Sequence, residues 1–109
     1  MIFQAPAVDS PLAVLRVVAP NASQRRLKLD GGPVTIGRAT DNILVLRDSR
    51  VSRYHGRLQA RSGALVYSDL GSTNGSRVNG IEVDEVVLGA GDRIEVGDTV
   101  LVVESAPGA

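Results

Sequence analysis

The feature that most constrains the fold of this chain is its division into short apolar runs by Gly, Asn, Asp and Pro. Several runs alternate apolar and polar residues, and no long segment shows the period of an amphipathic helix. The strand-like runs are residues 12–18, 26–30, 34–36, 43–46, 56–60, 64–67, 83–88, 92–96 and 99–104. Because many short strands with regular turn signals are typical of two packed sheets, we predict an all-β, antiparallel sandwich.

Glycine-containing pairs mark the sharpest expected turns. Asn74-Gly75 and Asn79-Gly80 combine residues that tolerate positive φ, which tight hairpin turns require. The stretch from Gly89 to Gly91 precedes a strand-like run and not a helix. We therefore expect a hairpin turn there and not a nucleotide-binding loop.

The chain length of 109 residues predicts one compact domain with a core of its own. Aromatic residues make up only 3%, so the core must be built mainly from Val, Leu and Ile. Residues 1–10 and 105–109 are small, Pro-containing and weakly patterned. We predict that they are flexible tails on either side of a domain at residues 11–104.

Composition argues against several classes of protein. The formal net charge is zero, whereas a general nucleic-acid binder is usually basic. No apolar run approaches the roughly 20 residues that cross a membrane. There are no cysteines, which removes disulfides and thiolate metal sites and fits a reducing compartment. We therefore expect a cytoplasmic domain with no metal and no cofactor.

The single histidine gives little basis for an enzyme. His55 lies three residues after Ser52, but Ser52 is not on the Gly-x-Ser-x-Gly turn of a hydrolase nucleophile. No Gly-x-x-x-x-Gly-Lys-Ser/Thr loop is present to bind a nucleotide. We expect His55 to be structural and the chain to be a binding module with no catalytic activity.

Three loop segments carry the polar residues of a candidate site. They are Ile36-Gly37-Arg38, Val51-Ser52-Arg53-Tyr54-His55 and Asp69-Leu70-Gly71-Ser72-Thr73-Asn74-Gly75. Loops of a rigid sandwich can converge at one end and form a site there. Between Arg38 and Arg57 the chain has only two aspartates, Asp41 and Asp48, against five arginines, which are Arg38, Arg47, Arg50, Arg53 and Arg57. Because arginine suits bidentate recognition of phosphate, a local anion site is compatible with zero net charge.

The order and spacing of these segments resemble the forkhead-associated (FHA) domain family. Fourteen residues separate Arg38 from Ser52, three separate Ser52 from His55, and nineteen separate His55 from Asn74. The longer forms Ile-Gly-Arg, Val-Ser-Arg-x-His and Asp-Leu-Gly-Ser-Thr-Asn-Gly-x-x-Val-Asn-Gly are also typical of the family. The resemblance covers roughly residues 12–104. It implies an eleven-stranded β-sandwich that binds phosphothreonine peptides through loops at one end.

The resemblance implies binding roles for the matching residues. Arg38 would contact the phosphate, Ser52 would donate its hydroxyl to a phosphate oxygen, and Thr73 would add a further contact nearby. Asn74 would hold the peptide backbone around the phosphothreonine. Arg53 stands where some members carry Asn, and it could reach the phosphate or the peptide backbone.

Other residues are expected to shape the loops or to select the peptide. The resemblance implies that His55 braces the loop of the key serine from below, that Gly37 and Gly75 permit the loop turns, and that Asn79 ties neighbouring loops together. Arg50 lies two residues before the key serine. In some members a residue there reads the side chain three places after the phosphothreonine, so Arg50 would favour an acidic residue.

A structural explanation stays open for each residue taken by itself. Arg38 could be a solvated loop arginine, Ser52 could cap a turn, and Asn74-Gly75 could be only a hairpin turn. The joint occurrence of the three segments predicts a phosphothreonine-dependent interaction module for Ser/Thr-kinase signalling. Its partners would be phosphothreonine-containing proteins, and not nucleic acids or membranes. Two alternatives are a scaffold that uses the same fold without phosphate and the recognition segment of a larger enzyme or secretion component.

Overall fold

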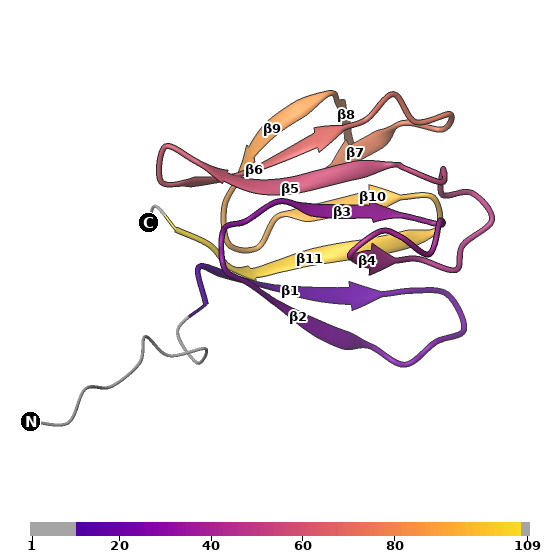
Figure 1. The fold of residues 1–109 in the computed structure, drawn as a ribbon, viewed down its shortest axis with the longest axis horizontal. Helices are drawn as coiled ribbons and strands as arrows, with labels where there is room; N and C mark the ends of the chain where they lie inside the picture. The colour runs from indigo at the N-terminus through magenta and orange to yellow at the C-terminus, as the bar shows by residue number, and fades with distance from the viewer. Residues whose placement is uncertain (1–10, 108–109) are drawn as a thin grey trace, which may run out of the picture.

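The computed structural model describes residues 11–107, which form two β-sheets packed face to face with no helix in that range (Figure 1). One sheet has six strands in the order β2-β1-β11-β10-β7-β8, and the other has five in the order β4-β3-β5-β6-β9. The strands are β1 (Ala13–Val18), β2 (Arg25–Leu29), β3 (Val34–Gly37), β4 (Leu44–Val45), β5 (Gly56–Arg61), β6 (Ala64–Asp69), β7 (Ser76–Val78), β8 (Ile81–Val83), β9 (Glu85–Leu88), β10 (Arg93–Val96) and β11 (Thr99–Ser105). The predicted all-β sandwich is confirmed.

One strand pair departs from the predicted antiparallel pattern. β3 and β4 run parallel, with Ile36 beside Leu44 and Gly37 beside Val45. The pairs recorded between the other strands are antiparallel. A short loop is enough for this parallel connection, because the two residues of β4 pair only with the last residues of β3.

The nine strand-like runs of the sequence become eleven strands for two local reasons. Residues 83–88 look like one run, but the chain bends at Asp84, so that β8 lies in the six-stranded sheet and β9 in the five-stranded sheet. The sequence pattern does not mark β7, because Ser76–Val78 contains a single apolar residue. A strand of this length is too short for a period to be recognised.

Of the expected hairpin turns, only Asn79-Gly80 is one. It joins β7 to β8 with φ angles of 52° and 84°, which suits the twist of a two-residue hairpin. Asn74-Gly75 lies between β6 and β7, and the stretch from Gly89 to Gly91 lies between β9 and β10. Both connect strands of different sheets, so the hairpin prediction was wrong for Gly89 to Gly91, and the alternative that Asn74-Gly75 is only a hairpin turn does not apply. Turn residues signal a change of direction, but they do not determine which sheet the next strand joins.

The last strand extends one residue beyond the strand-like run at residues 99–104. β11 continues through Ser105, which pairs with Val14, and Ala106 packs against the core. The predicted tail at residues 1–10 and the last residues, 108–109, lie outside the described residues. Within residues 11–107 no helix is long and apolar enough to cross a membrane.

The core is aliphatic, as the composition requires. In β1 the alternation is regular, with Ala13, Leu15 and Val17 at most 1% exposed and Arg16 facing outward. Tyr67 is the one aromatic side chain in the described core. The largest fully buried aliphatic side chains are Leu15, Ile36, Leu46, Leu58, Leu65, Ile94 and Leu101. Burial of each of these side chains stabilises the folded state by about 1.5–3 kcal/mol. The loops are therefore anchored on a well-packed core.

One end of the sandwich gathers the loops that carry the candidate residues. The β3–β4, β4–β5 and β6–β7 connections and the β10–β11 turn meet there, while the β5–β6 hairpin and the end of β11 lie at the opposite end (Figure 1). Segments far apart in the sequence therefore come side by side at this loop end, from strands of both sheets.

Asp48 joins the two sheets at the loop end. Its carboxylate accepts hydrogen bonds from the Arg50 N–H at 3.0 Å, and from the Asp98 N–H and the Thr99 hydroxyl at 2.8 Å each. Burial raises the pKa of Asp48, but these hydrogen bonds lower it by more, so that it lies below its ordinary value. Gly97 makes the close approach possible, because its φ is +59° and an added Cβ would lie 3.0 Å from the Asp48 carboxylate.

We predict that Asp48→Asn lowers the free energy of unfolding by about 2 kcal/mol at pH 7, because an amide cannot accept all three hydrogen bonds. A lowered folded-state pKa stabilises the protein above the unfolded pKa, which is about 3.9 for Asp, and that stability is lost as the pH falls through the folded pKa. The difference between the two proteins should therefore shrink below about pH 4. Urea unfolding across pH 3–7 measures it, with Asp98→Asn, an exposed control, expected to change stability by less than about 0.5 kcal/mol.

Candidate functional site

The three loop segments converge through hydrogen bonds to one another. The Arg38 N–H donates to the Ser52 carbonyl at 3.0 Å, and the Thr73 N–H donates to the Ser52 hydroxyl oxygen at 3.0 Å. The Asn74 amide donates to the Arg50 carbonyl at 2.8 Å. The loop of Ser52 therefore lies between the other two and is bonded to both. Of the predicted site residues, the fold brings these five together.

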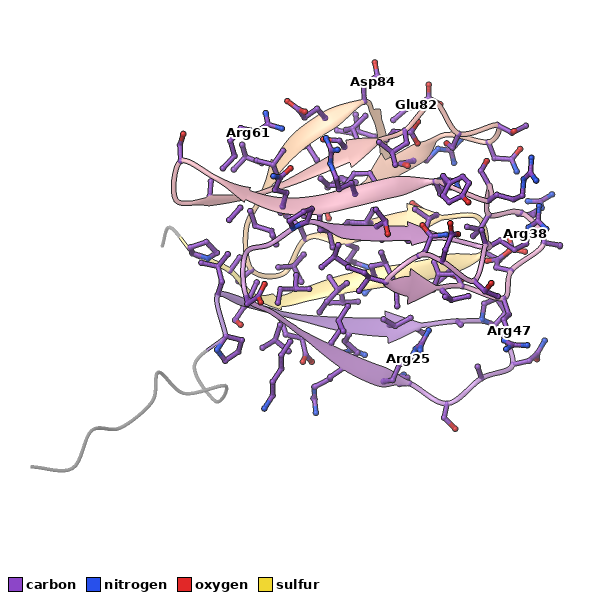
Figure 2. All side chains as sticks on the ribbon, in the orientation of Figure 1. Arg25, Arg38, Arg47, Arg61, Glu82 and Asp84 are labelled. Carbon is purple, nitrogen blue, oxygen red and sulfur yellow. The ribbon has the colours of Figure 1, made fainter. Side chains whose placement is uncertain are left out.

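The Arg38 side chain projects from the loop end and is exposed (Figure 2). Its Nε donates to the Val51 carbonyl at 3.1 Å, which fixes the direction of the guanidinium. The two η nitrogens make no hydrogen bond or ion pair among the described residues. A guanidinium held in this way keeps a fork of donors for a planar or tetrahedral oxyanion.

Ser52 is half-buried and uses its oxygen as an acceptor only. Because Oγ accepts the Thr73 N–H, the hydroxyl proton stays free to donate to a ligand. A hydroxyl that already accepts one hydrogen bond becomes a stronger donor through polarisation. The geometry therefore prepares Ser52 to donate to an anion beside Arg38.

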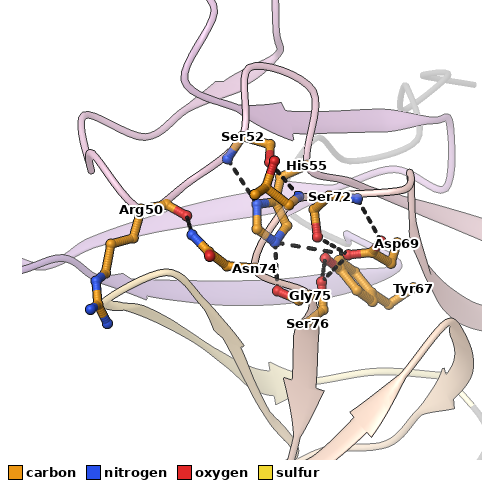
Figure 3. Close-up of polar contacts among 10 residues, drawn as sticks. Arg50, Ser52, His55, Tyr67, Asp69, Ser72, Asn74, Gly75 and Ser76 are labelled. Atoms are coloured by element: carbon orange, nitrogen blue, oxygen red, sulfur yellow. Dashed lines mark hydrogen bonds and ion pairs between the residues drawn. The ribbon is translucent and has the colours of Figure 1, made fainter.

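His55 lies fully buried beneath these loops with both ring nitrogens occupied (Figure 3). Nδ1 is 3.0 Å from the Ser52 N–H, and Nε2 is 2.9 Å from the Gly75 carbonyl. A backbone N–H can only donate and a carbonyl can only accept, so the imidazole is neutral with its proton on Nε2. His55 makes no hydrogen bond to the Ser52 hydroxyl, so the pair does not have the geometry of a nucleophile and its base.

A buried polar network continues below His55 (Figure 3). Ser76 donates to Asp69 Oδ1 at 2.7 Å, so the Tyr67 hydroxyl, 2.6 Å from the Ser76 oxygen, must donate to it. Ser72 binds the same carboxylate through its hydroxyl and its N–H, at 2.6 and 2.9 Å. Burial raises the pKa of Asp69, but the hydrogen bonds lower it by more, which keeps Asp69 ionised. The network holds the start of the β6–β7 loop in place under Thr73.

Two predicted glycines act for different reasons. Gly75 has a φ of +77°, a conformation that favours glycine, so it permits the loop turn as expected. Gly37 has no positive φ, and its role is close approach: an added Cβ would overlap the Arg53 carbonyl. Gly37 therefore allows the end of β3 to lie against the loop that carries Ser52. Gly56 is a third such position, because a Cβ there would overlap the Tyr67 hydroxyl.

Sequence reasoning assigned no role to Asn42, which lies between the loops. Its amide donates to the Ala39 carbonyl at 2.8 Å and to the Arg53 carbonyl at 2.7 Å, and the side chain is 7% exposed. It clamps the β3–β4 loop to the loop that carries Ser52. Asn42, like Asp48 and Asp69, is a short polar residue beside a strand-like run, which by itself is an ordinary loop composition.

The Arg50 side chain and the remaining predicted residues lie at the edge of the site or outside it. Arg50 is exposed, with Nη1 3.7 Å from Asp98, and borders a hollow of about 280 Å³ together with Asn74. The Arg53 side chain is exposed and makes no recorded hydrogen bond. Asn79 is not at this site: its amide binds Asp92 at 2.9 Å and ties the β7–β8 turn to the start of β10.

The arrangement can bind an anion, and nothing in it is arranged for a metal. Within residues 11–107 no group of three or more histidine, aspartate or glutamate side chains is positioned to hold a metal ion. The donors that remain free at this end include the Arg38 η nitrogens and the Ser52 hydroxyl, on backbone held by Thr73, Asn42 and His55. Such fixed donors suit a group with several strong acceptor oxygens.

The chain is similar to known proteins over most of its length, and not only in the three loop segments. The model of a family described as "Inner membrane component of T3SS, cytoplasmic domain" matches residues 16–106. The glycogen accumulation regulator GarA of Mycolicibacterium smegmatis is 37% identical over 102 residues, which cover 94% of this chain. The matched part is 63% of that relative, so the chain spans less than two thirds of its length.

Two solved structures share the fold over nearly their whole length. The FhaA FHA domain, in complex with the intracellular domain of Rv3910, is 34% identical with a TM-score of 0.76, and the match covers 84% of this chain and 98% of that one. An FHA domain from an analysis of phosphothreonine-dependent FHA domain interactions is 33% identical with a TM-score of 0.77, covering 88% and 99%. Since the likeness extends over whole domains as well as over the three loops, the chain belongs to the forkhead-associated (FHA) domain family.

Proposed function

We propose that this domain binds phosphothreonine in partner proteins and thereby acts as an interaction module in cytoplasmic Ser/Thr-kinase signalling. The observation that carries the proposal is the convergence of two free, prepositioned donors, the Arg38 guanidinium and the Ser52 hydroxyl, on one loop end. A phosphothreonine has a charge of about −1.5 to −2 and three strong acceptor oxygens. Partners would be kinases or their substrates.

Thr73, Asn74 and Arg53 complete the proposed pocket. Thr73 and Arg53 are exposed beside Ser52, where their side chains can reach the phosphate or the adjoining peptide. Asn74 donates one amide hydrogen to the Arg50 carbonyl and keeps its oxygen and second hydrogen for the peptide backbone. Arg50 would read a residue further along the peptide. The phosphothreonine-dependent interactions named for a similar FHA domain support this assignment.

A module without catalytic activity fits the geometry best. The two nitrogens of His55 are occupied by backbone groups, and the side chain is 0% exposed, so it cannot act as a base for a ligand in the site. The relative GarA has the name of a regulator. The donors on Arg38 and Ser52 argue against the alternative of a scaffold that works without phosphate, because the Arg38 η nitrogens and the Ser52 hydroxyl proton have no acceptor among the described residues.

The deciding experiment is calorimetric titration with matched phosphothreonine, phosphoserine and unphosphorylated peptides. Binding of the phosphothreonine peptide alone supports the proposal. Equal binding of the unphosphorylated peptide would favour the phosphate-independent scaffold. The other alternative, that the domain is the recognition segment of a larger enzyme or secretion component, predicts the same titration results. It is tested by identifying the protein in which the domain occurs in the cell.

We predict that Arg38→Ala and Ser52→Ala each weaken phosphopeptide binding by about 10- to 100-fold, because each removes a hydrogen bond to a charged group worth about 1.5–3 kcal/mol. The fold should be unchanged, since both side chains lie in loops. Arg93→Ala and Ser49→Ala are the matched controls, because both residues are exposed and neither side chain makes a recorded hydrogen bond. Titration together with circular dichroism measures the effect, and unchanged affinity in either folded variant would contradict the site.

We predict that His55→Ala lowers the free energy of unfolding by about 2–4 kcal/mol, because it leaves a cavity and two unpaired backbone groups. It should also weaken phosphopeptide binding, because the Ser52 loop loses its support. His55→Asn can still accept the Ser52 N–H and should keep more of the affinity than His55→Ala. Chemical denaturation and titration of both variants test this, and full affinity in a destabilised His55→Ala protein would contradict the positioning role.

We predict a preference for phosphothreonine over phosphoserine of at least tenfold. The two groups have the same charge, so Arg38 cannot separate them, and a recess between the Arg38 loop and residues 72–74 must seat the methyl group. A methyl in a fitted pocket discriminates by about 1–3 kcal/mol, whereas simple transfer of one CH₂ gives only about 0.8 kcal/mol. Titration with two peptides that differ only in that methyl measures the ratio. Equal affinities would reduce the pocket to a general phosphate site.

A further inference from the structure

A groove separate from the phosphate loops lies along one edge of the sandwich. It has a volume of about 580 Å³ and lies where β2 and β4, the edge strands of the two sheets, approach each other. Residues of the β1–β2 connection also line it. Small and aliphatic side chains form much of its lining, namely Val17, Ala19, Ala22, Val45 and Leu46. The groove therefore has a mainly apolar lining.

Two arginines border this groove without a carboxylate to neutralise them. Arg47 makes no hydrogen bond or ion pair within residues 11–107. Arg25 donates one hydrogen bond from Nη2 to the Val45 carbonyl at 2.9 Å and keeps its other donors. No acidic side chain is among the described residues that line the groove. By contrast, Arg16 and Arg26 both pair with Glu104 on the outer face of the six-stranded sheet.

The groove adjoins the loops of the phosphate site. Thr40 lines it and belongs to the β3–β4 loop that starts at Arg38, while Arg47 belongs to the β4–β5 loop that carries Ser52. Figure 2 shows Arg47 at the same end of the molecule as Arg38, with Arg25 set further back. The hollow bordered by Arg50 and Asn74 is lined instead by residues of β7, β10 and the β10–β11 turn. If a peptide is bound at Arg38, the segments before and after its phosphothreonine can therefore each reach a different hollow, the groove between β2 and β4 or the hollow beside Arg50.

We propose that the groove between β2 and β4 binds an acidic segment of the same partner whose phosphothreonine occupies the Arg38 and Ser52 site. The two uncompensated arginines supply the charge complementarity, and the apolar floor takes the stems of the acidic side chains. The inference rests on the proposed function, because the phosphothreonine brings the acidic segment to the groove. The segment is a flank of the peptide several residues away from the phosphothreonine, on one side of it only.

The test uses phosphothreonine peptides with three glutamates or three glutamines placed either before or after the phosphothreonine. Against the unchanged protein, glutamates on one flank should raise the affinity about three- to tenfold, because each exposed charge pair contributes about two- to fivefold. Higher ionic strength should reduce the gain. Arg47→Gln should remove much of the gain and leave the affinity for the glutamine peptide unchanged. Arg93→Gln, the same change of charge on β10, should keep the whole gain.

The outcomes separate this inference from the proposed function. If the glutamine peptide binds and glutamates on neither flank raise the affinity, the groove does not bind an acidic segment, although phosphothreonine recognition stands. A glutamate gain that persists in Arg47→Gln and in Arg25→Gln would also overturn the assignment. If no phosphopeptide binds at all, both proposals fail. If glutamates do not raise the affinity, but the protein binds vesicles with one quarter phosphatidylserine and this binding requires Arg47, the groove binds a lipid surface instead.

Discussion

The arrangement of the loop end depends on one buried imidazole. His55 has no contact with solvent, so each of its nitrogens needs a partner inside the protein. The partners are backbone groups of two different loops, the Ser52 N–H and the Gly75 carbonyl, which lies twenty residues along the chain from His55. Because a lost partner would leave a buried polar group unpaired, the ring holds the two loops at one separation. The direction of the Ser52 hydroxyl follows from that separation.

Hydrogen bonds of two other buried side chains also hold these loops and connect them to both sheets. Asn42 joins the β3–β4 loop to the Arg53 carbonyl, and Asp48 joins the β4–β5 loop to the β10–β11 turn. The proposed anion site therefore includes two free donors, the Arg38 guanidinium and the Ser52 hydroxyl, on backbone that is held in place by these hydrogen bonds. Preorganised donors lose little conformational entropy on binding, which lets a small number of contacts give a useful affinity. Arg50 and Arg53 are exposed beside these clamped loops, where the proposed peptide would meet them.

Much of the fold and of the site could be predicted from local patterns. The alternation in residues 12–18 and 92–96 corresponds to β1 and β10, and the Asn79-Gly80 pair forms a tight hairpin. Arg38, Ser52, His55 and Asn74 were predicted because the order and spacing of their segments resemble the FHA family, and the fold brings all four to one end. Asn42 could not be found in this way, because a short amide in a loop has no period and no distinctive neighbour. The bend at Asp84 was hidden because the apolar residues continue on both sides of it.

The sequence by itself determined the all-β class, the aliphatic core and the spacing of the three loop segments, because strand alternation, turn chemistry and chain length are properties of neighbouring residues. Only the tertiary structure decided that Asn74-Gly75 crosses between sheets, that Gly37 is needed for the approach of the Arg53 carbonyl, and that β2 and β4 leave a groove with two arginines. The tautomer of His55 was also decided by the tertiary structure, because its two partners lie in different loops. Each of these features arises from residues far apart in the chain, whose contacts exist only once the two sheets have packed.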